Sequence, residues 1–324
     1  IHNTTLGPAL GGTRMWPYAT EEEAITDVLR LSRGMTFKNA LAGLNLGGGK
    51  AVIIGDPKLK NEAFLRRFGR FVQSLGGRYV TAEDVNMKTS DMEYIAMETK
   101  HVTGLPEIKG GGGDPSPVTA YGTYMGMKAA AKKAFGSDSL SGKKICVQGV
   151  GQVGKYLIEY LIKEGAEVLI TDIFEDKLKK VALDTGAVAI DPNLIYDMDM
   201  DIYAPCALGA TINDDTIDRL KCAVIAGGAN NQLKDEAKHG QILLEKGIIY
   251  APDFLINAGG VINVGAEYFG GYNREIVYKQ AEKIYDTCLY ILNKSEKENI
   301  PAQQAAIEAA KERINAIGRV KLSF

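Results

Sequence analysis

The sequence contains few of the residues that build metal centres or disulfide-bonded scaffolds. Only 4 cysteines and 3 histidines occur among 324 residues. The cysteines are widely spaced and form no CxxC pair, so neither a zinc site nor a disulfide framework is expected. This cysteine usage favours a reducing, cytoplasmic setting.

Long apolar runs and an excess of one charge are also missing. No apolar stretch reaches the roughly 18–20 residues that a membrane-spanning helix needs. The chain carries 38 basic and 40 acidic residues, interspersed along its length, for a net charge of −2. This balance argues against nucleic acid or a membrane as a partner. The chain begins with Ile1-His2-Asn3 rather than with a signal peptide or an initiator Met, so we expect an N-terminal segment to precede it.

The length and pattern of the chain predict two α/β domains, since one domain takes roughly 100–200 residues. In the first part, helical segments at 21–33 and 61–75 are mixed with strand-like segments at 50–54 and 78–81. A glycine and proline cluster at 110–117 predicts a loop near the domain boundary. We therefore expect a first domain over residues 1–118 and a second over 119–300, with a C-terminal helix within 301–324 packing back on the first.

In the second part of the chain, strand-like and helical segments alternate. Strands are expected at 145–148, 167–172, 200–205, 222–226 and 248–252, and helices at 120–133, 153–164 and 302–317. Strands that alternate with helices in this way predict a parallel, doubly wound sheet.

A glycine-rich turn marks a dinucleotide site in this second domain. Gly149-Val150-Gly151-Gln152-Val153-Gly154 follows a predicted strand and opens a predicted helix, which is the context that the G-x-G-x-x-G pattern requires. Gly151 lets the backbone approach a pyrophosphate, and the helix N-terminus offers it N–H groups. Asp172, 18 residues after Gly154, is placed to bind ribose hydroxyls and repel a 2′-phosphate. The pattern favours NAD; the alternatives are a flavin site or a turn that binds nothing.

Two further loops follow predicted strands of the same sheet, namely Cys206-Ala207-Leu208-Gly209 and Gly227-Gly228-Ala229-Asn230-Asn231. Ligands of open α/β sheets bind at the carboxyl ends of the strands, so both loops are expected to line the cofactor site. Asn230 and Asn231 either bond to the cofactor or cap their own turn.

Three charged residues of the first domain are candidates for chemistry. Lys50 stands between a triple glycine and an apolar strand, where a solvent-exposed charge is not expected. A buried lysine beside a second cation, such as Lys38, has a lowered pKa and can act as a general base. A lysine that keeps its charge instead binds a carboxylate. Asp84 is a candidate proton shuttle for an amine.

Six motifs occur in an order that resembles the glutamate/leucine/phenylalanine/valine dehydrogenases along essentially the whole chain. They are Leu6-Gly7-Pro8-Ala9-Leu10-Gly11-Gly12-Thr13-Arg14, Gly34-Met35-Thr36-Phe37-Lys38-Asn39, Gly47-Gly48-Gly49-Lys50, Thr81-Ala82-Glu83-Asp84-Val85, Pro115-Ser116-Pro117-Val118-Thr119-Ala120-Tyr121-Gly122 and Asn257-Ala258-Gly259-Gly260-Val261-Ile262-Asn263. The resemblance implies an N-terminal α/β substrate domain, a Rossmann-type NAD domain and an active-site cleft between them. It also implies a homo-oligomer, either a dimer or an octamer.

The resemblance assigns roles to residues of both domains. It implies that Lys38 binds the substrate carboxylate with the backbone of Gly11 and Gly12, that Lys50 activates water, and that Asp84 serves the amino group. Thr119 and Asn231, with Asn230 as neighbour, are implied at the nicotinamide half of NAD, and Asn257 is implied as a further cofactor-binding residue.

The same resemblance implies NAD-dependent oxidative deamination of a branched-chain amino acid to its 2-oxo acid and ammonia. The side-chain pocket is implied at Leu10, Met35, Ala82, Val261 and Val264, all of them apolar. A second carboxylate would be costly to bury there, whereas leucine, isoleucine and valine should all fit. The alternatives are a dehydrogenase of phenylalanine or another aromatic amino acid, and a non-catalytic protein that senses NAD.

Overall fold

The computed structural model describes residues 1–320, and these divide into two compact units. Unit 1 combines Ile1–Pro115, Val261–Val277 and the residues from 310 to 320; unit 2 combines Ser116–Gly260 and Tyr278–Ala309. The structure differs here from the division expected from the sequence, which kept 261–277 with the second domain. Residues 321–324 of the expected C-terminal helix lie outside the described residues.

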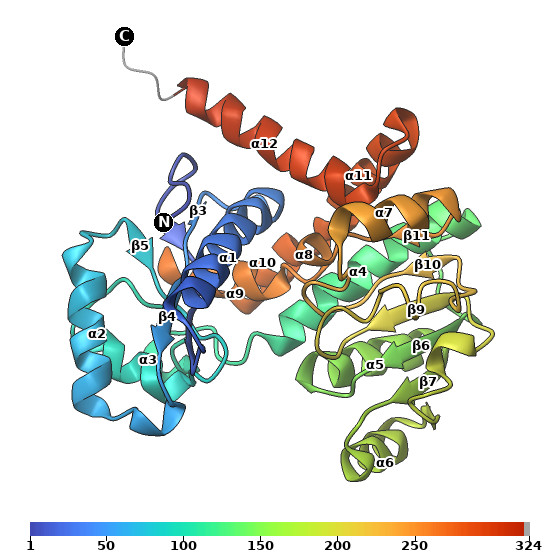
Figure 1. The fold of residues 1–324 in the computed structure, drawn as a ribbon, viewed down its shortest axis with the longest axis horizontal. Coiled ribbons are helices and arrows are strands. Elements are labelled where there is room, and N and C mark those ends of the chain that lie inside the picture. The colour runs from blue at the N-terminus through green and yellow to red at the C-terminus, as the bar shows by residue number, and fades with distance from the viewer. Residues whose placement is uncertain (321–324) are drawn as a thin grey trace. The chain divides into compact units, whose positions relative to one another are not determined.

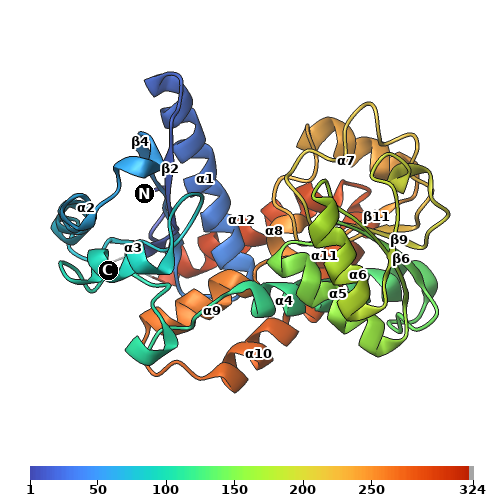
Figure 2. The ribbon, with the colours of Figure 1, turned by 90° about the horizontal axis from the view of Figure 1, so that it is seen from below.

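Unit 1 contains two small parallel sheets with helices packed around them. One sheet has the strand order β3-β1-β5, and the other pairs β2 with β4. Its elements are β1 (Ala9–Leu10), β2 (Thr13–Trp16), α1 (Glu21–Leu41), β3 (Gly47–Gly48), β4 (Ala51–Ile54), η1 (Pro57–Leu59), α2 (Glu62–Ser74), β5 (Tyr79–Val80), α3 (Thr89–Ala96) and η2 (Glu107–Lys109). Helices α2 and α3 pack side by side (Figure 2).

Three later helices also contribute to unit 1. They are α9 (Gly259–Tyr268), the start of α10 (Arg274–Glu282) and the end of α12 (Ala302–Val320). Val264 and Tyr268 of α9 pack on a buried cluster of Leu10, Leu46 and Val80, which explains why residues 261–277 belong to this unit.

Unit 2 is built on a six-stranded parallel sheet with the order β11-β10-β9-β6-β7-β8 (Figure 1). This order is that of a doubly wound dinucleotide-binding sheet, whose direction of winding reverses between β6 and β9. The strands are β6 (Lys144–Gln148), β7 (Glu167–Thr171), β8 (Val188–Ala189), β9 (Ile202–Pro205), β10 (Val224–Ile225) and β11 (Ile249–Tyr250). The predicted α/β class with a Rossmann-type sheet is confirmed.

Helices cover this sheet. They are α4 (Ser116–Phe135), α5 (Gln152–Glu164), α6 (Glu175–Thr185), η3 (Ile195–Asp197), α7 (Glu236–Glu245), α8 (Asp253–Ile256) and α11 (Ile284–Glu298). Helices α5 and α6 pack against each other and against β7, and α4 packs on α5 and α11. The central strands are fully buried, as Ile145, Val147 and Tyr203 show. Among residues 1–320, no helix combines the length and the apolar character needed to cross a membrane.

Candidate active site

A buried ion pair joins two of the predicted catalytic residues in unit 1. Lys50 Nζ lies 2.5 Å from Asp84 Oδ2, and the Lys50 side chain is only 8% exposed. Lys50 immediately precedes β4, and Asp84 follows β5. Strand β2 lies between them, since Thr13 pairs with Ala51 on one side and with Glu83 on the other. The parallel register therefore brings the two charges together.

Arg14, on β2, is a second cation of this site that the sequence analysis gave no role. Arg14 Nε donates to Asp84 Oδ2 at 3.3 Å, and its Nη1 donates to Asp27 Oδ2 at 3.0 Å. Burial of the Asp84 carboxyl opposes ionisation, but the charge and hydrogen bonding of Lys50 together with Arg14 outweigh it and hold the pKa of Asp84 below its ordinary value. Asp84 is therefore a carboxylate near neutral pH.

Gly11 and Gly12 pass close to the same pair, where a side chain would not fit. A Cβ on Gly12 would lie 2.3 Å from the Glu83 carbonyl oxygen and 3.0 Å from Asp84 Cβ. A Cβ on Gly11 would lie 1.8 Å from the Gly49 carbonyl oxygen. The Gly11 N–H donates to the Val80 carbonyl, so it is already engaged in the sheet. A contact of the Gly11 and Gly12 backbone with a substrate carboxylate stays a prediction.

Lys38 lies in the last turn of α1 and is half-buried. Met35, a predicted pocket residue, lies three positions earlier and therefore on the same helix face. The amide of Asn39 fixes this part of α1, because its Nδ2 donates to the carbonyls of Leu10 at 3.3 Å and Gly47 at 2.6 Å. Helix α1 is thus bonded to the strands β1 and β3 beside the glycine-rich segment.

The predicted pocket residues do not share one environment. Leu10 is fully buried in the core cluster that it forms with Leu46 and Val80, and Ala82 is 7% exposed. Met35, Val261 and Val264 are half-buried. Leu10 is thus a core residue in this structure, whereas the three half-buried side chains keep some accessible apolar surface.

Glu267 of α9 is a residue that the sequence analysis missed. Its carboxylate accepts hydrogen bonds from the backbone N–H groups of Gly104 (3.0 Å), Leu105 (3.1 Å) and Gly112 (3.1 Å). Asn263, one turn earlier, donates to the Gly112 carbonyl at 3.2 Å. The helix that carries two of the predicted pocket residues therefore holds the 104–112 loop, and only the run of glycines at 110–113 signalled that loop.

In unit 2, the glycine-rich turn has the shape that a pyrophosphate requires. Gly149 has φ +101°, and a Cβ there would lie 2.6 Å from the Ala207 backbone nitrogen. A Cβ on Gly154 would lie 2.1 Å from the Gly149 carbonyl oxygen. Gly151, the N-cap of α5, instead has open space around it and makes no side-chain cap bond. The N–H groups at Gln152 and the next residue thus begin a helix beside free space, which suits a bound phosphate.

Asp172 follows β7 and is hydrogen-bonded to this turn. Its Oδ2 accepts from the Val150 N–H at 2.8 Å, and its Oδ1 accepts from the Phe174 N–H at 3.0 Å. Each carboxylate oxygen has two acceptor sites, so both retain capacity for a hydroxyl donor. Asp172 therefore fixes the glycine-rich turn and still fits the predicted ribose contact.

The other predicted cofactor residues gather at the carboxyl ends of β9 and β10. Cys206 Sγ accepts from the Gly228 N–H at 3.3 Å, and a Cβ on Gly228 would lie 2.7 Å from Val153 Cγ1. Asn257 Nδ2 donates to Asn230 Oδ1 at 2.7 Å. Asn257 Oδ1 is buried and has no hydrogen-bond partner among the described residues, so it is ready to accept from a ligand.

Two predicted cofactor residues lie in different surroundings. Leu208 is 91% exposed, so its side chain makes little contact with the rest of unit 2. Thr119 is half-buried on α4, where its carbonyl accepts from Thr123 Oγ1 at 2.9 Å.

Comparisons with known proteins cover both units. Residues 1–101 match the family model described as Glu/Leu/Phe/Val dehydrogenase, dimerisation domain, and residues 110–172 and 170–320 match the model described as Glutamate/Leucine/Phenylalanine/Valine dehydrogenase. The chain is 59% identical to a leucine dehydrogenase from Bacillus subtilis, covering 100% of this chain and 89% of that protein. It is 58% identical to a leucine dehydrogenase from Thermoactinomyces intermedius, covering 100% of this chain and 88% of that protein.

A solved structure gives the same result for the fold. The crystal structure of L-tryptophan dehydrogenase from Nostoc punctiforme is 45% identical to this chain, with a TM-score of 0.89 over 98% of this chain and 92% of that one. Two family models and two full-length relatives thus agree on one family.

Proposed function

The chain belongs to the glutamate/leucine/phenylalanine/valine dehydrogenase family, and from this premise we propose that it catalyses the NAD-dependent oxidative deamination of branched-chain L-amino acids. The products are the 2-oxo acid, ammonia and NADH. The observation that carries the proposal is the buried Lys50–Asp84 ion pair beside Gly12, in a chain of which the most similar relatives described above are named leucine dehydrogenase.

The charges in unit 1 support a division of labour. Lys38 is assigned to the substrate carboxylate, and Asp84 to the substrate amino group. Because its pKa is lowered, Asp84 starts the reaction as a carboxylate and takes up the proton that the substrate ammonium loses. Arg14 compensates the buried charge of Asp84 but stays protonated, since a guanidinium does not exchange protons near neutral pH.

Lys50 is assigned to the water that attacks the imino carbon. Once Asp84 is protonated, Lys50 gives its own proton to solvent, and as the neutral amine it then takes up the proton that the water loses. Its ion pair with Asp84 couples the proton states of the two groups, because proton uptake by Asp84 removes the anion that faces the Lys50 ammonium. Collapse of the resulting carbinolamine then needs a proton on the departing nitrogen, which Asp84 supplies, and the carbinolamine hydroxyl loses its proton to solvent as the carbonyl forms. Asp84 is thereby returned to the carboxylate.

The residues of unit 2 fit NAD as the partner of this chemistry. NAD, when bound, accepts the hydride from the substrate Cα. The free space at Gly151, the start of α5 and the remaining acceptor capacity of Asp172 suit a pyrophosphate and an unphosphorylated ribose. The orphaned Asn257 Oδ1 suits a donor such as the carboxamide N–H group.

The substrate proposal depends on the apolar character of Met35, Val261 and Val264. None of these side chains can neutralise a second carboxylate, and burying one without a cation is costly. A methylene group changes binding by only roughly 1–3 kcal/mol, so leucine, isoleucine and valine are all expected as substrates.

We also infer that the chain acts as a homo-oligomer, a dimer or an octamer, because residues 1–101 match a family model described as a dimerisation domain. Light scattering coupled to size-exclusion chromatography tests this. A monomer at assay concentration would contradict it.

One assay tests the catalytic proposal, namely NADH formation across leucine, valine, phenylalanine, tryptophan and glutamate, repeated with NADP. We expect the highest kcat/KM with leucine and NAD. A preference for phenylalanine or tryptophan would keep the reaction but overturn the substrate. NADH binding without turnover of any amino acid would indicate a non-catalytic protein that senses NAD.

A further inference from the structure

The two loops expected to line the cofactor site are bonded to each other. The Ala210 N–H donates to the Asn231 carbonyl at 2.6 Å, and the Ile212 N–H donates to the Gln232 carbonyl at 3.0 Å. The Lys234 N–H returns a bond to Ile212 at 3.0 Å. The segment after β9 and the segment after β10 therefore run together as a short ladder, and a shift of one loop moves the other.

This ladder contains residues in conformations that they do not prefer. Ala210 has φ +63° and Asn231 has φ +52°, both in the left-handed region. A Cβ on Gly209 would lie 2.5 Å from the Asn230 carbonyl oxygen. Such backbone persists only where the surrounding structure holds it in place. Fixed points outside the ladder hold these segments, and Asp253 is one, since its Oδ2 accepts from the Gln232 N–H at 3.0 Å.

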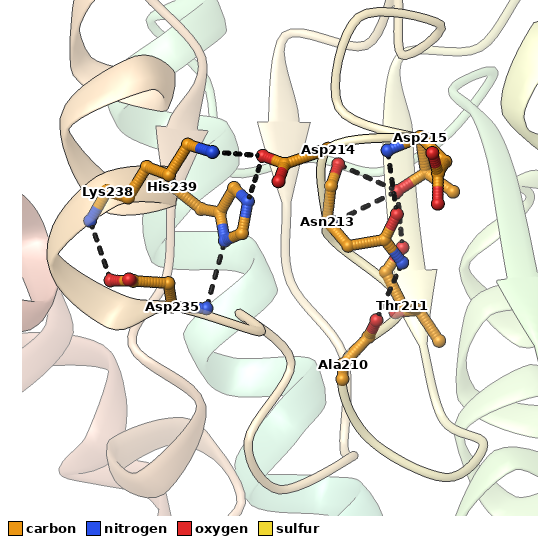
Figure 3. A network of polar contacts seen from close by, with 9 residues as sticks. Ala210, Thr211, Asn213, Asp214, Asp215, Asp235, Lys238 and His239 are labelled. Atoms are coloured by element: carbon orange, nitrogen blue, oxygen red, sulfur yellow. Dashed lines mark hydrogen bonds and ion pairs between the residues drawn. The ribbon is translucent and has the colours of Figure 1, made fainter.

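His239 of α7 provides such a fixed point (Figure 3). Its side chain is 2% exposed and contacts both segments. The Asp235 N–H, at the end of the segment after β10, donates to His239 Nδ1 at 3.0 Å. His239 Nε2 lies 3.1 Å from Asp214 Oδ1, in the segment after β9. One buried ring thus bridges the far ends of the two loops.

The hydrogen-bond partners of His239 define which nitrogen of its ring carries the proton. Because Nδ1 accepts a backbone N–H, it carries no proton, and Nε2 carries the proton that faces Asp214. The groups around the ring are Asp214, the Lys238 ammonium 2.7 Å from Asp214, and Asp235, whose carboxylate caps the Lys238 N–H at the start of α7. The neutral ring therefore satisfies one donor and one acceptor from two different segments.

We propose that His239 is a positioning residue for cofactor binding. Resting on the proposed function, the inference is that His239 holds the 206–216 and 227–235 segments in the register that places Cys206, Ala207 and Asn230 against the nicotinamide half of NAD. His239 itself touches neither cofactor nor substrate. Its loss should therefore weaken NAD binding and leave the chemical step largely intact.

The test compares His239→Leu, His239→Gln and His239→Asn in the full-length protein. Leucine removes both bonds, glutamine keeps a donor near the Nε2 position, and asparagine keeps an acceptor near the Nδ1 position. The readouts are the Kd for NADH from fluorescence titration, the KM for NAD, the KM for leucine and kcat. We expect His239→Leu to weaken NADH binding about tenfold, because an unpaired buried polar group shifts an equilibrium by roughly that factor. Glutamine and asparagine should each restore part of the affinity.

A matched pair of exposed aspartates keeps the test decisive if His239→Leu does not fold. Asp214→Ala removes the partner of His239. Asp218→Ala, two positions beyond the 206–216 segment, removes an ion pair of 2.9 Å with Lys246, the residue that follows α7. Asp214 and Asp218 are 62% and 78% exposed, so both variants should fold. We expect Asp214→Ala to weaken NADH binding about threefold, a part of the histidine effect, and Asp218→Ala to leave it unchanged.

The outcomes separate this inference from the proposed function. A lower Tm with unchanged NADH affinity and KM in His239→Leu and Asp214→Ala would show that the ring is only structural and would overturn the inference. Equal changes of the Kd for NADH in Asp214→Ala and Asp218→Ala would also overturn the inference. A wild-type protein that binds NADH but oxidises no amino acid contradicts the proposed function and leaves the positioning inference to be decided by the Kd values alone.

Discussion

At the scale of single residues, the burial of Lys50 decides its interpretation. A lysine in a sequence is usually a solvated surface residue. At 8% exposure, the Lys50 ammonium is instead shielded and paired with Asp84, and Arg14 gives Asp84 a second cation. This arrangement keeps a proton donor and a proton acceptor in contact next to glycine backbone.

We expect Lys50→Met to lower kcat by about three orders of magnitude, in the range found for loss of a general acid–base group. The methionine keeps the aliphatic stem, and Arg14 still faces Asp84, so the protein should fold. NADH affinity should stay within about twofold, because the residues proposed to bind the cofactor lie in unit 2. Stopped-flow kinetics and NADH titration check both statements, with the exposed Lys58→Met as control. Near-normal kcat would show that another group activates the water.

The pKa of Glu83 is shifted in the opposite direction from the pKa of its neighbour Asp84, and this shift can be tested separately. Burial raises the pKa of the Glu83 carboxyl, as do the negative charges of Asp114, Asp91 and Glu267, although a hydrogen bond of 2.6 Å from Thr89 opposes them. The fold therefore favours the protonated form. This contribution to stability is complete below the ordinary pKa and is lost as the pH rises through the raised one.

Glu83→Gln should accordingly raise the Tm at pH 7–8 and leave it nearly unchanged near pH 4, because glutamine stays neutral and its Oε1 still accepts from Thr89. Calorimetry at both pH values checks this. Glu22→Gln, which removes an exposed charge, is the control. A Tm gain in Glu83→Gln that is equal at both pH values would contradict the assignment.

A functional residue could be predicted from the sequence where its immediate neighbours in the chain form a recognisable pattern. Lys50 stood out because it follows three glycines and precedes an apolar strand, and Gly149 to Gly154 stood out by spacing. Arg14 and Glu267 did not, because Asp84, which Arg14 contacts in the site, and Gly104, which Glu267 contacts, lie 70 and 163 positions away in the sequence. No local pattern reports such a contact.

At the scale of elements, the predicted segments match the structure in type and differ mainly at their ends. The helix expected at 21–33 continues to Leu41 as α1, although Gly34 is a poor helix former. A Cβ at Gly34 would meet nothing within 4 Å, so the glycine is not required by packing. Short pieces such as β1, β3 and β8 were missed, because two residues are too few to show a period.

Replacing a glycine by alanine is therefore expected to change the free energy of unfolding in opposite directions in α1 and α2. Gly34→Ala should raise the free energy of unfolding by about 0.5–1 kcal/mol, since alanine costs less backbone entropy in a helix. Gly69→Ala should lower it by about 1–3 kcal/mol, because the new Cβ would lie 2.8 Å from the Ile95 carbonyl oxygen of α3. Urea unfolding measures both. The same sign for the two variants would contradict the packing described for these helices.

At the scale of the whole molecule, the chain assembles unit 1 from three separate segments. Val264 and Tyr268 complete the cluster around Leu10, and these residues are more than 250 positions apart in the sequence. From the sequence, no helix is expected over 259–268 and residues 261–277 stay with the second domain, so the assignment of 261–277 to unit 1 required the structure. For unit 2, by contrast, the alternation of strands and helices predicts a parallel, doubly wound sheet, but β8 and the order of the strands required the structure.

The C-terminal helix α12 also joins unit 1 through contacts between residues that are far apart in the sequence. Arg313 Nη1 donates to the Ala40 carbonyl at 2.7 Å and to the Leu44 carbonyl at 2.9 Å, across 273 and 269 positions of sequence. These carbonyls lie at and just beyond the end of α1, where helix groups lack intrahelical partners and a cation is favourable. The end of α12 thus caps the helix that carries Lys38.

Arg313→Met should therefore lower the free energy of unfolding by about 1–3 kcal/mol, because it keeps the aliphatic stem but leaves partly buried carbonyls without their charged donor. Amide hydrogen exchange should quicken at residues 42–44, whose N–H groups bond back to Lys38, Asn39 and Ala40. Lys311→Met, at an exposed position of the same helix, is the control and should change neither quantity. If exchange at residues 42–44 is unaltered in Arg313→Met, the cap does not stabilise α1, and the link from the C-terminal helix to the Lys38 turn must be abandoned.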